Sequence, residues 1–120
     1  MSHSEKRKHT RLPAGDKAFA LVKNGVNNVG QIIDVSRGGL AFKYMSEASL
    51  PGCTPRLDVF VPGHKFLWTK IPHRTVRDMD LLLEAPFSTI RMKRRSIAFD
   101  PLSEEHLVRL EVLIAYLKSL

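Results

Sequence analysis

Two short polar segments contain the side chains best suited to bind a ligand or to take part in a reaction. The first is Arg7-Lys8-His9-Thr10-Arg11, which places two guanidinium groups four residues apart in a segment without apolar residues. The second is Asp34-Val35-Ser36-Arg37-Gly38-Gly39, which combines short polar side chains with glycines. A guanidinium presents a planar fork of N–H donors that suits phosphates and carboxylates. The first segment therefore predicts an anionic partner, and the second predicts a turn.

The overall charge also favours an anionic partner. Nineteen lysines and arginines against twelve acidic residues give a formal net charge of +7. The basic residues gather in two clusters, which are Lys6, Arg7, Lys8 and Arg11 in the first and Arg91, Lys93, Arg94 and Arg95 in the second. Such clusters indicate a nucleotide, a nucleic acid or an acidic membrane surface as the partner, although a basic tail can also be merely solvated.

The turn segment has two interpretations. Glycine permits positive φ and lets another group approach the backbone closely, so Gly38 and Gly39 predict a turn that a ligand could approach. Asp34 and Ser36 could contact that ligand, or they could only bond to nearby backbone N–H groups.

The other reactive side chains do not form a catalytic or metal-binding pattern. The cysteine and the histidines show no metal-ligand spacing; they are Cys53, His3, His9, His64, His73 and His106. No nucleophile elbow, phosphate-binding loop or dinucleotide fingerprint is present. The sequence predicts no enzymatic activity, no metal and no cofactor. Trp68 is expected in the core or on a barrel surface.

Alternating apolar residues predict a mainly β protein of one domain. Residues 1–16 are polar and basic, contain Pro13 and Gly15, and read as a flexible N-terminal arm. Residues 17–120 form the folded domain, in which period-two alternation and frequent turn residues predict antiparallel strands, arranged as a small barrel. The predicted strands cover residues 17–23, 29–35, 39–45, 57–61, 66–68 and 96–99. Residues 78–94 are harder to interpret and could form a hairpin around Ala85-Pro86.

The C-terminal segment predicts an amphipathic helix. Ser103 is a suitable N-cap, and Glu104 and Glu105 follow where the helix dipole favours acids. Apolar residues then recur at helical spacing, at Leu107, Leu110, Ile114 and Leu117. This apolar face must pack on the barrel or pair with a second copy of the chain.

In this order, the two polar segments resemble the signature of the PilZ family, which is an Arg-x-x-x-Arg arm followed by Asp-x-Ser-x-x-Gly. Arg7 and Arg11 match the first motif, and Asp34, Ser36 and Gly39 match the second. The resemblance extends over nearly the whole chain and implies a small six-stranded antiparallel β-barrel that ends in a helix. Ser96 stands where many members carry glycine, and residues 64–94 match poorly.

The resemblance implies a receptor for cyclic di-GMP, which carries two phosphodiesters and two guanines. The implied ligand contacts are Arg7, Arg11, Asp34, Ser36 and Gly39, with Lys6, Lys8, Arg37 and Gly38 as possible additional contacts. Arginine matches guanine O6 and N7 as well as phosphate, and a carboxylate suits the N1–H and N2–H₂ donors of guanine. Binding would order the arm and so relay the level of this second messenger to a protein partner.

Two other functions are compatible with the same residues. A ligand-independent PilZ adaptor would act only through protein contacts, although such adaptors typically lose the arginine and Asp-Ser residues that are intact here. A nucleic-acid-binding barrel would account for the charge, but only 8% of the residues are aromatic and most of them alternate as core residues do.

One cysteine and the lack of an apolar leader predict a cytoplasmic location. The downstream process, the number of bound ligands and the oligomeric state stay open.

Overall fold

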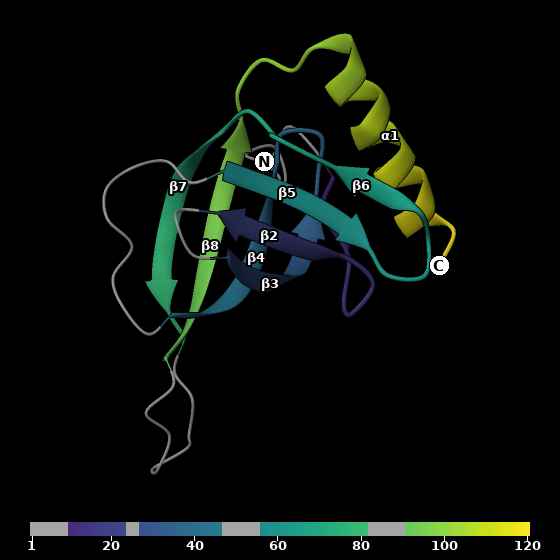
Figure 1. The fold of residues 1–120 in the computed structure, drawn as a ribbon. Helices are drawn as coiled ribbons and strands as arrows, with labels where there is room; N and C mark the ends of the chain where they lie inside the picture. The colour runs from purple at the N-terminus through teal and green to yellow at the C-terminus, as the bar shows by residue number, and fades with distance from the viewer. Residues whose placement is uncertain (1–9, 24–26, 47–55, 82–90) are drawn as a thin grey trace, which may run out of the picture.

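A computed structural model describes residues 10–23, 27–46, 56–81 and 91–120. These residues form eight strands and one helix (Figure 1). The elements are β1 (Leu12–Pro13), β2 (Phe19–Lys23), β3 (Asn27–Val35), β4 (Gly39–Ser46), β5 (Arg56–Val61), β6 (Phe66–Trp68), β7 (His73–Asp80), β8 (Arg91–Phe99) and α1 (Glu104–Lys118).

The strands form one antiparallel sheet that curls around the core. The hydrogen-bonded order is β6-β5-β2-β3-β4-β8-β7, and β1 pairs with β3 beside this path. In Figure 1 the β2–β5 pair lies in front of β3, β4 and β8, and α1 lies beside β6. The two ends of β3 have different surroundings, because β1 pairs with β3 only at the end that leads into β4.

The core fills the inside of the curl, as the alternation predicts. In β5 the side chains of Leu57, Val59 and Val61 are buried. Trp68 of β6 is also buried and packs against Phe99, with the two ring centroids 5.5 Å apart. Trp68 is thus a core residue.

Helix α1 covers the core with its apolar face. The hydroxyl oxygen of Ser103 accepts a hydrogen bond from the backbone N–H of His106 at 3.4 Å, which confirms the predicted N-cap. The buried residues of the helix are Leu110, Leu113, Ile114 and Leu117. The prediction that this face packs on the barrel is confirmed for Leu110, Ile114 and Leu117, whereas Leu107 is exposed and Leu113 is buried in its place. No helix among the described residues has both the length and the apolar character to span a bilayer.

The predicted fold class is confirmed, but the strand number and the closure of the barrel need correction. The described residues contain eight strands rather than six, and within them no hydrogen-bonded ladder joins β6 to β7. Strand β7 was missed because it lies at the edge of the sheet, and every residue after His73 is exposed. Without a buried face, such a strand lacks the alternation that marks a strand in a sequence.

Strands β7 and β8 form a hairpin that overlaps residues 78–94, where a hairpin around Ala85-Pro86 was one possibility, but this hairpin already begins at His73. Strands β7 and β8 pair from His73 opposite Phe99 to Asp80 opposite Lys93. The predicted turn at Ala85-Pro86 lies outside the described residues.

The end of the predicted arm belongs to the sheet. Leu12 and Pro13 pair with the last two residues of β3. The backbone N–H of Ala14 donates to the carbonyl oxygen of Ile33 at 2.9 Å, and Ala14 is buried. Residues 12–14 are therefore anchored directly beside Asp34, where a ligand site was predicted.

Candidate ligand-binding site

Ser36 holds together the turn between β3 and β4. Its hydroxyl oxygen accepts hydrogen bonds from the backbone N–H groups of Gly38 at 3.2 Å and Gly39 at 3.3 Å. The backbone N–H of Ser36 donates to the carbonyl oxygen of Gly39 at 2.8 Å. A serine hydroxyl that bonds to backbone groups two or three residues later is a common way to stabilise a turn. Ser36 therefore shapes the backbone that follows Asp34.

Asp34 faces outward because β3 contains a bulge. Its pairing with β4 shifts register between Ile32 and Asp34, which leaves Ile33 as an extra residue. As a result Ile32 and Val35 are both fully buried, whereas the Asp34 side chain is 18% exposed. With strict alternation, Asp34 would point into the core beside Ile32. The bulge thus delivers the carboxylate to the surface.

Two guanidinium groups flank the Asp34 carboxylate. Nη1 of Arg11 lies 3.7 Å from Oδ1, and Nη2 of Arg94 lies 4.0 Å from Oδ2. Arg11 immediately precedes β1, and Arg94 belongs to β8 on the other side of β4. Both distances exceed the roughly 2.7–3.2 Å of an N–H···O hydrogen bond. These two guanidinium groups therefore attract the carboxylate without donating hydrogen bonds to it.

Arg94 was not among the predicted site residues, although the second basic cluster contains it. Alternation in β8 divides this cluster between two faces of the sheet. Arg95 points inward and is 6% exposed, whereas Arg94 points outward towards Asp34. The side chain of Arg91 lies outside the described residues. The signal that could have found Arg94 is its spacing of three from the core residue Ile97, which places it on the opposite face of the strand.

Arg95 belongs to a buried polar group rather than to the candidate site. It donates hydrogen bonds to Asp78 at 3.0 Å and to the hydroxyl of Tyr44 at 3.3 Å. Lys93 lies 3.6 Å from the same Asp78 carboxylate. Burial and the hydrogen bond to Asp78 raise the pKa of Tyr44 to about 12. This group ties together β4, β7 and β8.

Gly39 allows two strands to approach closely, and it does so without a positive φ. Its φ lies outside the left-handed region that favours glycine. A Cβ placed on Gly39 would overlap the carbonyl oxygen of Ile97 and would lie 3.1 Å from Cα of Ala98. The structure therefore needs glycine here for the contact between β4 and β8. Contact between a ligand and the backbone of Gly39 remains a prediction.

Two of the possible additional contacts have partners within the protein. The Arg37 guanidinium donates to Glu111 of α1 with both ends of its fork, at 2.7 Å and 3.0 Å. This hydrogen-bonded pairing raises the pKa of Arg37 and lowers the pKa of Glu111. The backbone N–H of Gly38 donates to Ser36, and its carbonyl oxygen accepts from Phe99 at 2.9 Å. The other predicted contacts in the arm, Lys6, Arg7 and Lys8, lie outside the described residues.

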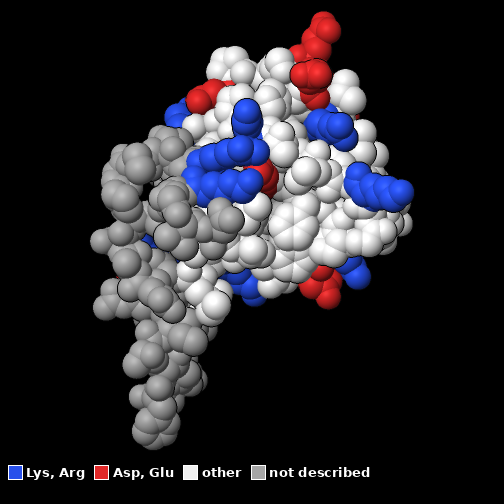
Figure 2. Space-filling model, viewed as in Figure 1, with Lys and Arg blue, Asp and Glu red and all other residues white. Residues whose placement is uncertain are grey.

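Asp58, unlike Asp34, is a buried carboxylate with a structural role. It is 2% exposed and lies 3.1 Å from Nε of Arg56 and 3.4 Å from Nζ of Lys23. It also accepts a hydrogen bond from the backbone N–H of Lys70 at 2.9 Å. Burial opposes ionisation of Asp58, but these hydrogen bonds and the charge of Arg56 hold its pKa below the ordinary value. Figure 2 shows basic groups gathered around acidic atoms on the face that β2 and β5 form.

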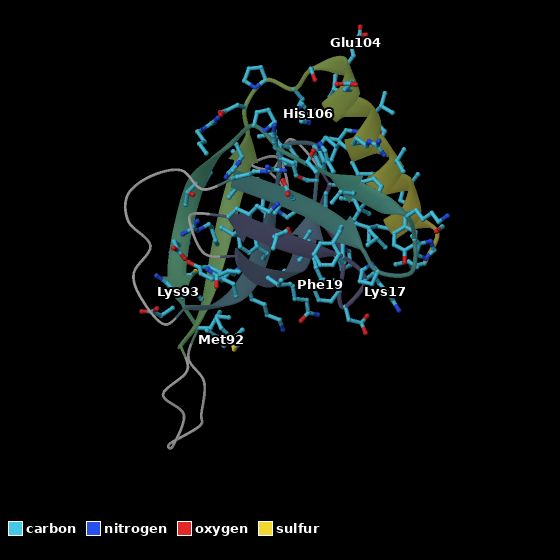
Figure 3. The ribbon with its side chains drawn as sticks, in the orientation of Figure 1. Lys17, Phe19, Met92, Lys93, Glu104 and His106 are labelled. Atoms are coloured by element: carbon cyan, nitrogen blue, oxygen red, sulfur yellow. The ribbon has the colours of Figure 1, made fainter. Side chains whose placement is uncertain are left out.

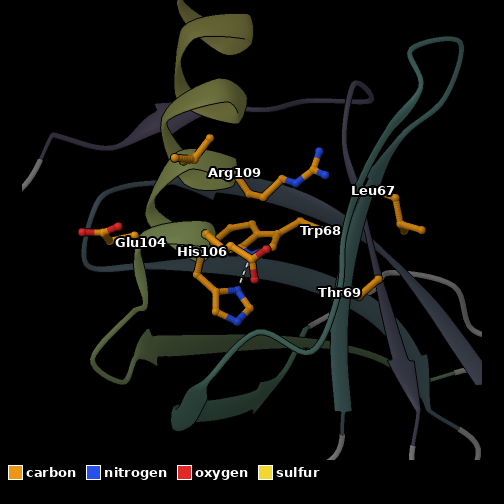
Figure 4. Close-up of a pocket in the computed structure, with 8 residues that line it drawn as sticks. Leu67, Trp68, Thr69, Glu104, His106 and Arg109 are labelled. Carbon is orange, nitrogen blue, oxygen red and sulfur yellow. Dashed lines mark hydrogen bonds between the residues drawn. The ribbon is translucent and has the colours of Figure 1, made fainter.

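A groove of about 570 Å³ lies between β6 and the first turns of α1 (Figure 4). Along it, Nε1–H of Trp68 donates to Nδ1 of His106 at 2.8 Å. This bond requires Nδ1 of His106 to be unprotonated and fixes the ring against the core. His106 and Glu104 lie far from Lys93 of β8 (Figure 3), so the groove is separate from the basic cluster of that strand. The described residues contain no group of three potential metal ligands.

The comparisons with known proteins agree with this architecture. No family model matches the sequence, and no curated protein matches it either. Among solved structures, the chain is similar to the PilZ domain with c-di-GMP of YcgR from Escherichia coli. The TM-score is 0.70 at 15% sequence identity, and the match covers 95% of this chain and 92% of that one. This likeness shows a PilZ-type fold.

Proposed function

We propose that this chain is a receptor for cyclic di-GMP. The observation that carries the proposal is the surface position of Asp34, which lies between the guanidinium groups of Arg11 and Arg94. The fold supports it, because the similar YcgR domain is a PilZ domain with c-di-GMP. The role is binding rather than catalysis.

The chemistry of the site suits this ligand. Asp34 accepts hydrogen bonds from N1–H and N2–H₂ of one guanine, and Arg7 and Arg11 offer their forks to the phosphodiesters or to guanine edges. Ser36 and Gly39 shape the turn beside the bound base. Two guanidinium groups around one carboxylate leave a local excess of positive charge, which favours a ligand with two negative charges.

The N-terminal arm provides the response to the ligand. Arg7 lies four residues before Arg11, which is already held beside Asp34 by β1. Ligand binding draws Arg7 and its neighbours onto the outer face of the sheet, and the new position of the arm signals to a protein partner. The single cysteine is compatible with a reducing compartment, so we place this receptor in the cytoplasm.

Calorimetric titration with cyclic di-GMP tests the proposal, with GTP and cyclic di-AMP as control ligands. We expect a dissociation constant in the micromolar range or below, which is about −8 kcal/mol. Arg7→Ala, Arg11→Ala and Asp34→Ala should each weaken binding by about ten- to hundredfold, because each removes a charge-assisted contact. Lys8→Ala should change it much less, since a lysine in the arm offers only a screened charge. Amide exchange of the arm should slow when the ligand binds.

Two results would contradict the proposal. If the wild-type protein does not bind cyclic di-GMP at all, the ligand-independent adaptor becomes the better interpretation. If Lys8→Ala lowers the affinity for cyclic di-GMP as much as Arg11→Ala does, diffuse charge attraction dominates and a nucleic-acid partner is favoured.

A further inference from the structure

We infer that Arg94 reads the O6 edge of the same guanine whose N1–H and N2–H₂ groups Asp34 accepts, and so makes the site specific for guanine. The inference rests on the proposed function, since it assigns a role to a residue of the same site. Arg94 lies outside both motifs of the sequence, and only the pairing of β8 with β4 brings it to Asp34.

The register of three strands places Arg94 across the site from the turn. Asp34 pairs with Ala41 of β4, and Ala41 pairs with Ser96 of β8. Arg94 is two residues before Ser96 and therefore lies on the same outer face of β8. Ala41 has a small, buried side chain, and Nη2 of Arg94 lies 4.0 Å from Oδ2 of Asp34 across β4. The carboxylate and the guanidinium thus lie side by side above a small residue.

This pair complements one edge of guanine. Along that edge O6 is an acceptor, whereas the neighbouring N1–H and N2–H₂ are donors. An arginine beside a carboxylate presents the opposite order, a donor next to an acceptor. Adenine has a donor amino group at C6 and an acceptor at N1. The amino group would face the donors of Arg94, and N1 would face the acceptor oxygens of Asp34. A site of this kind therefore discriminates against adenine by leaving polar groups unpaired.

The contact between Arg94 and Asp34 is weak enough to be rearranged by a ligand. The Arg94 side chain is 35% exposed, and its distance to the carboxylate is too long for a hydrogen bond. Arg95 and Arg37 differ in this respect, because each already donates hydrogen bonds to an acidic side chain. Turning the guanidinium of Arg94 towards a base therefore breaks no hydrogen bond to Asp34.

The test compares two variants of Arg94 with a matched control. Arg94→Ala should weaken cyclic di-GMP binding by about ten- to hundredfold. Arg94→Lys should weaken binding almost as much, because lysine keeps the charge but lacks the planar fork of donors. Arg109→Ala removes the same charge from an exposed position of α1 and should change the affinity by less than about twofold. Circular dichroism and melting temperature establish that each variant is folded.

An additional ligand tests whether Arg94 contacts O6. Cyclic di-inosine monophosphate keeps O6 and N1–H and lacks only the N2 amino group. The fold loss caused by Arg94→Ala should be the same for this ligand as for cyclic di-GMP. The loss caused by Asp34→Ala should be smaller for the inosine ligand, because one of the hydrogen bonds to Asp34 is already missing.

The outcomes separate the inference from the proposed function. If wild type binds cyclic di-GMP and Arg94→Ala behaves like Arg109→Ala, the assignment of Arg94 is wrong and the receptor stands. Full recovery by Arg94→Lys would also overturn the assignment, since a point charge would then suffice. If wild type does not bind cyclic di-GMP, it is the proposed function that fails.

Discussion

At the scale of single residues, the outer face of β3, β4 and β8 depends on small side chains and on one inserted residue. Ile33 is the extra residue of the β3 bulge, and without it Asp34 would point into the core. Gly39 lets β8 come close to β4. The positions of Asp34 and of Arg94 therefore both depend on local backbone features of neighbouring strands.

Gly39→Ala should lower stability and binding together. The added Cβ would overlap a backbone carbonyl oxygen of Ile97, so β4 and β8 would have to separate. Overpacking of this kind costs about 1–3 kcal/mol, which corresponds to a melting temperature lower by several degrees. Thermal denaturation and calorimetric titration of the same preparation check this. A variant that loses affinity at an unchanged melting temperature would show instead that Gly39 serves the ligand directly.

At the scale of elements, the turn between β3 and β4 is linked to helix α1. Arg37 lies in the predicted motif, but its guanidinium donates two hydrogen bonds to Glu111. The side chains of both partners are about half exposed, so solvent screens the pair. The Arg37–Glu111 pair therefore contributes little to holding α1 in place. The Arg37 guanidinium can instead turn towards an anion that binds at the turn.

Glu111→Gln should strengthen cyclic di-GMP binding. The substitution removes a negative charge near the turn and releases Arg37 towards an anionic ligand, so we expect a gain of about twofold to fivefold at low salt. The melting temperature should change only slightly. Glu105→Gln, which removes the same charge from the first turn of α1, is the control and should leave the affinity unchanged. Weaker binding by Glu111→Gln would mean that the link to α1 supports the site.

At the scale of the whole molecule, the ionised carboxylate of Asp58 helps to hold the curled sheet together. Arg56 and Lys23 lie against it from β5 and β2, and Lys70 donates to it from the segment after β6. The pKa of Asp58 in the folded protein is below the ordinary value of 3.8. A carboxylate with a lowered pKa stabilises the fold above its unfolded pKa, and this contribution is lost as the pH falls towards the folded pKa.

Wild-type stability should therefore fall below about pH 5, as Asp58 begins to protonate in the unfolded chain. Asp58→Asn should melt at a lower temperature at pH 7 and should show a shallower decline towards pH 3. Melting curves between pH 7 and pH 3 measure both effects. Asp100→Asn, at a half-exposed carboxylate that pairs with Arg74, controls for the loss of one negative charge from a solvent-screened ion pair. Parallel pH profiles for wild type and Asp58→Asn would contradict this role.

Features that depend on neighbours along the chain could be predicted from the sequence. The period-two alternation of β5, the Ser103 cap and the apolar face of α1 are local regularities, because backbone geometry sets their spacing. The Asp34–Gly39 motif is local in the same sense, and a resemblance between sequences was enough to find it. The edge strand β7 was missed because it has no buried face to impose a pattern.

The surroundings of Asp34 could not be predicted from the sequence. Which residues meet across strands depends on register, and the single extra residue Ile33 changes that register and turns the carboxylate outward. Arg94 reaches Asp34 because β8 pairs with β4, and Arg37 turns away to Glu111 because α1 packs beside the turn. The spacing of Arg94 from Ile97 places Arg94 on the outer face of β8, but no spacing encodes the contacts themselves, because they join segments that are distant in the chain and are set by how the strands pair.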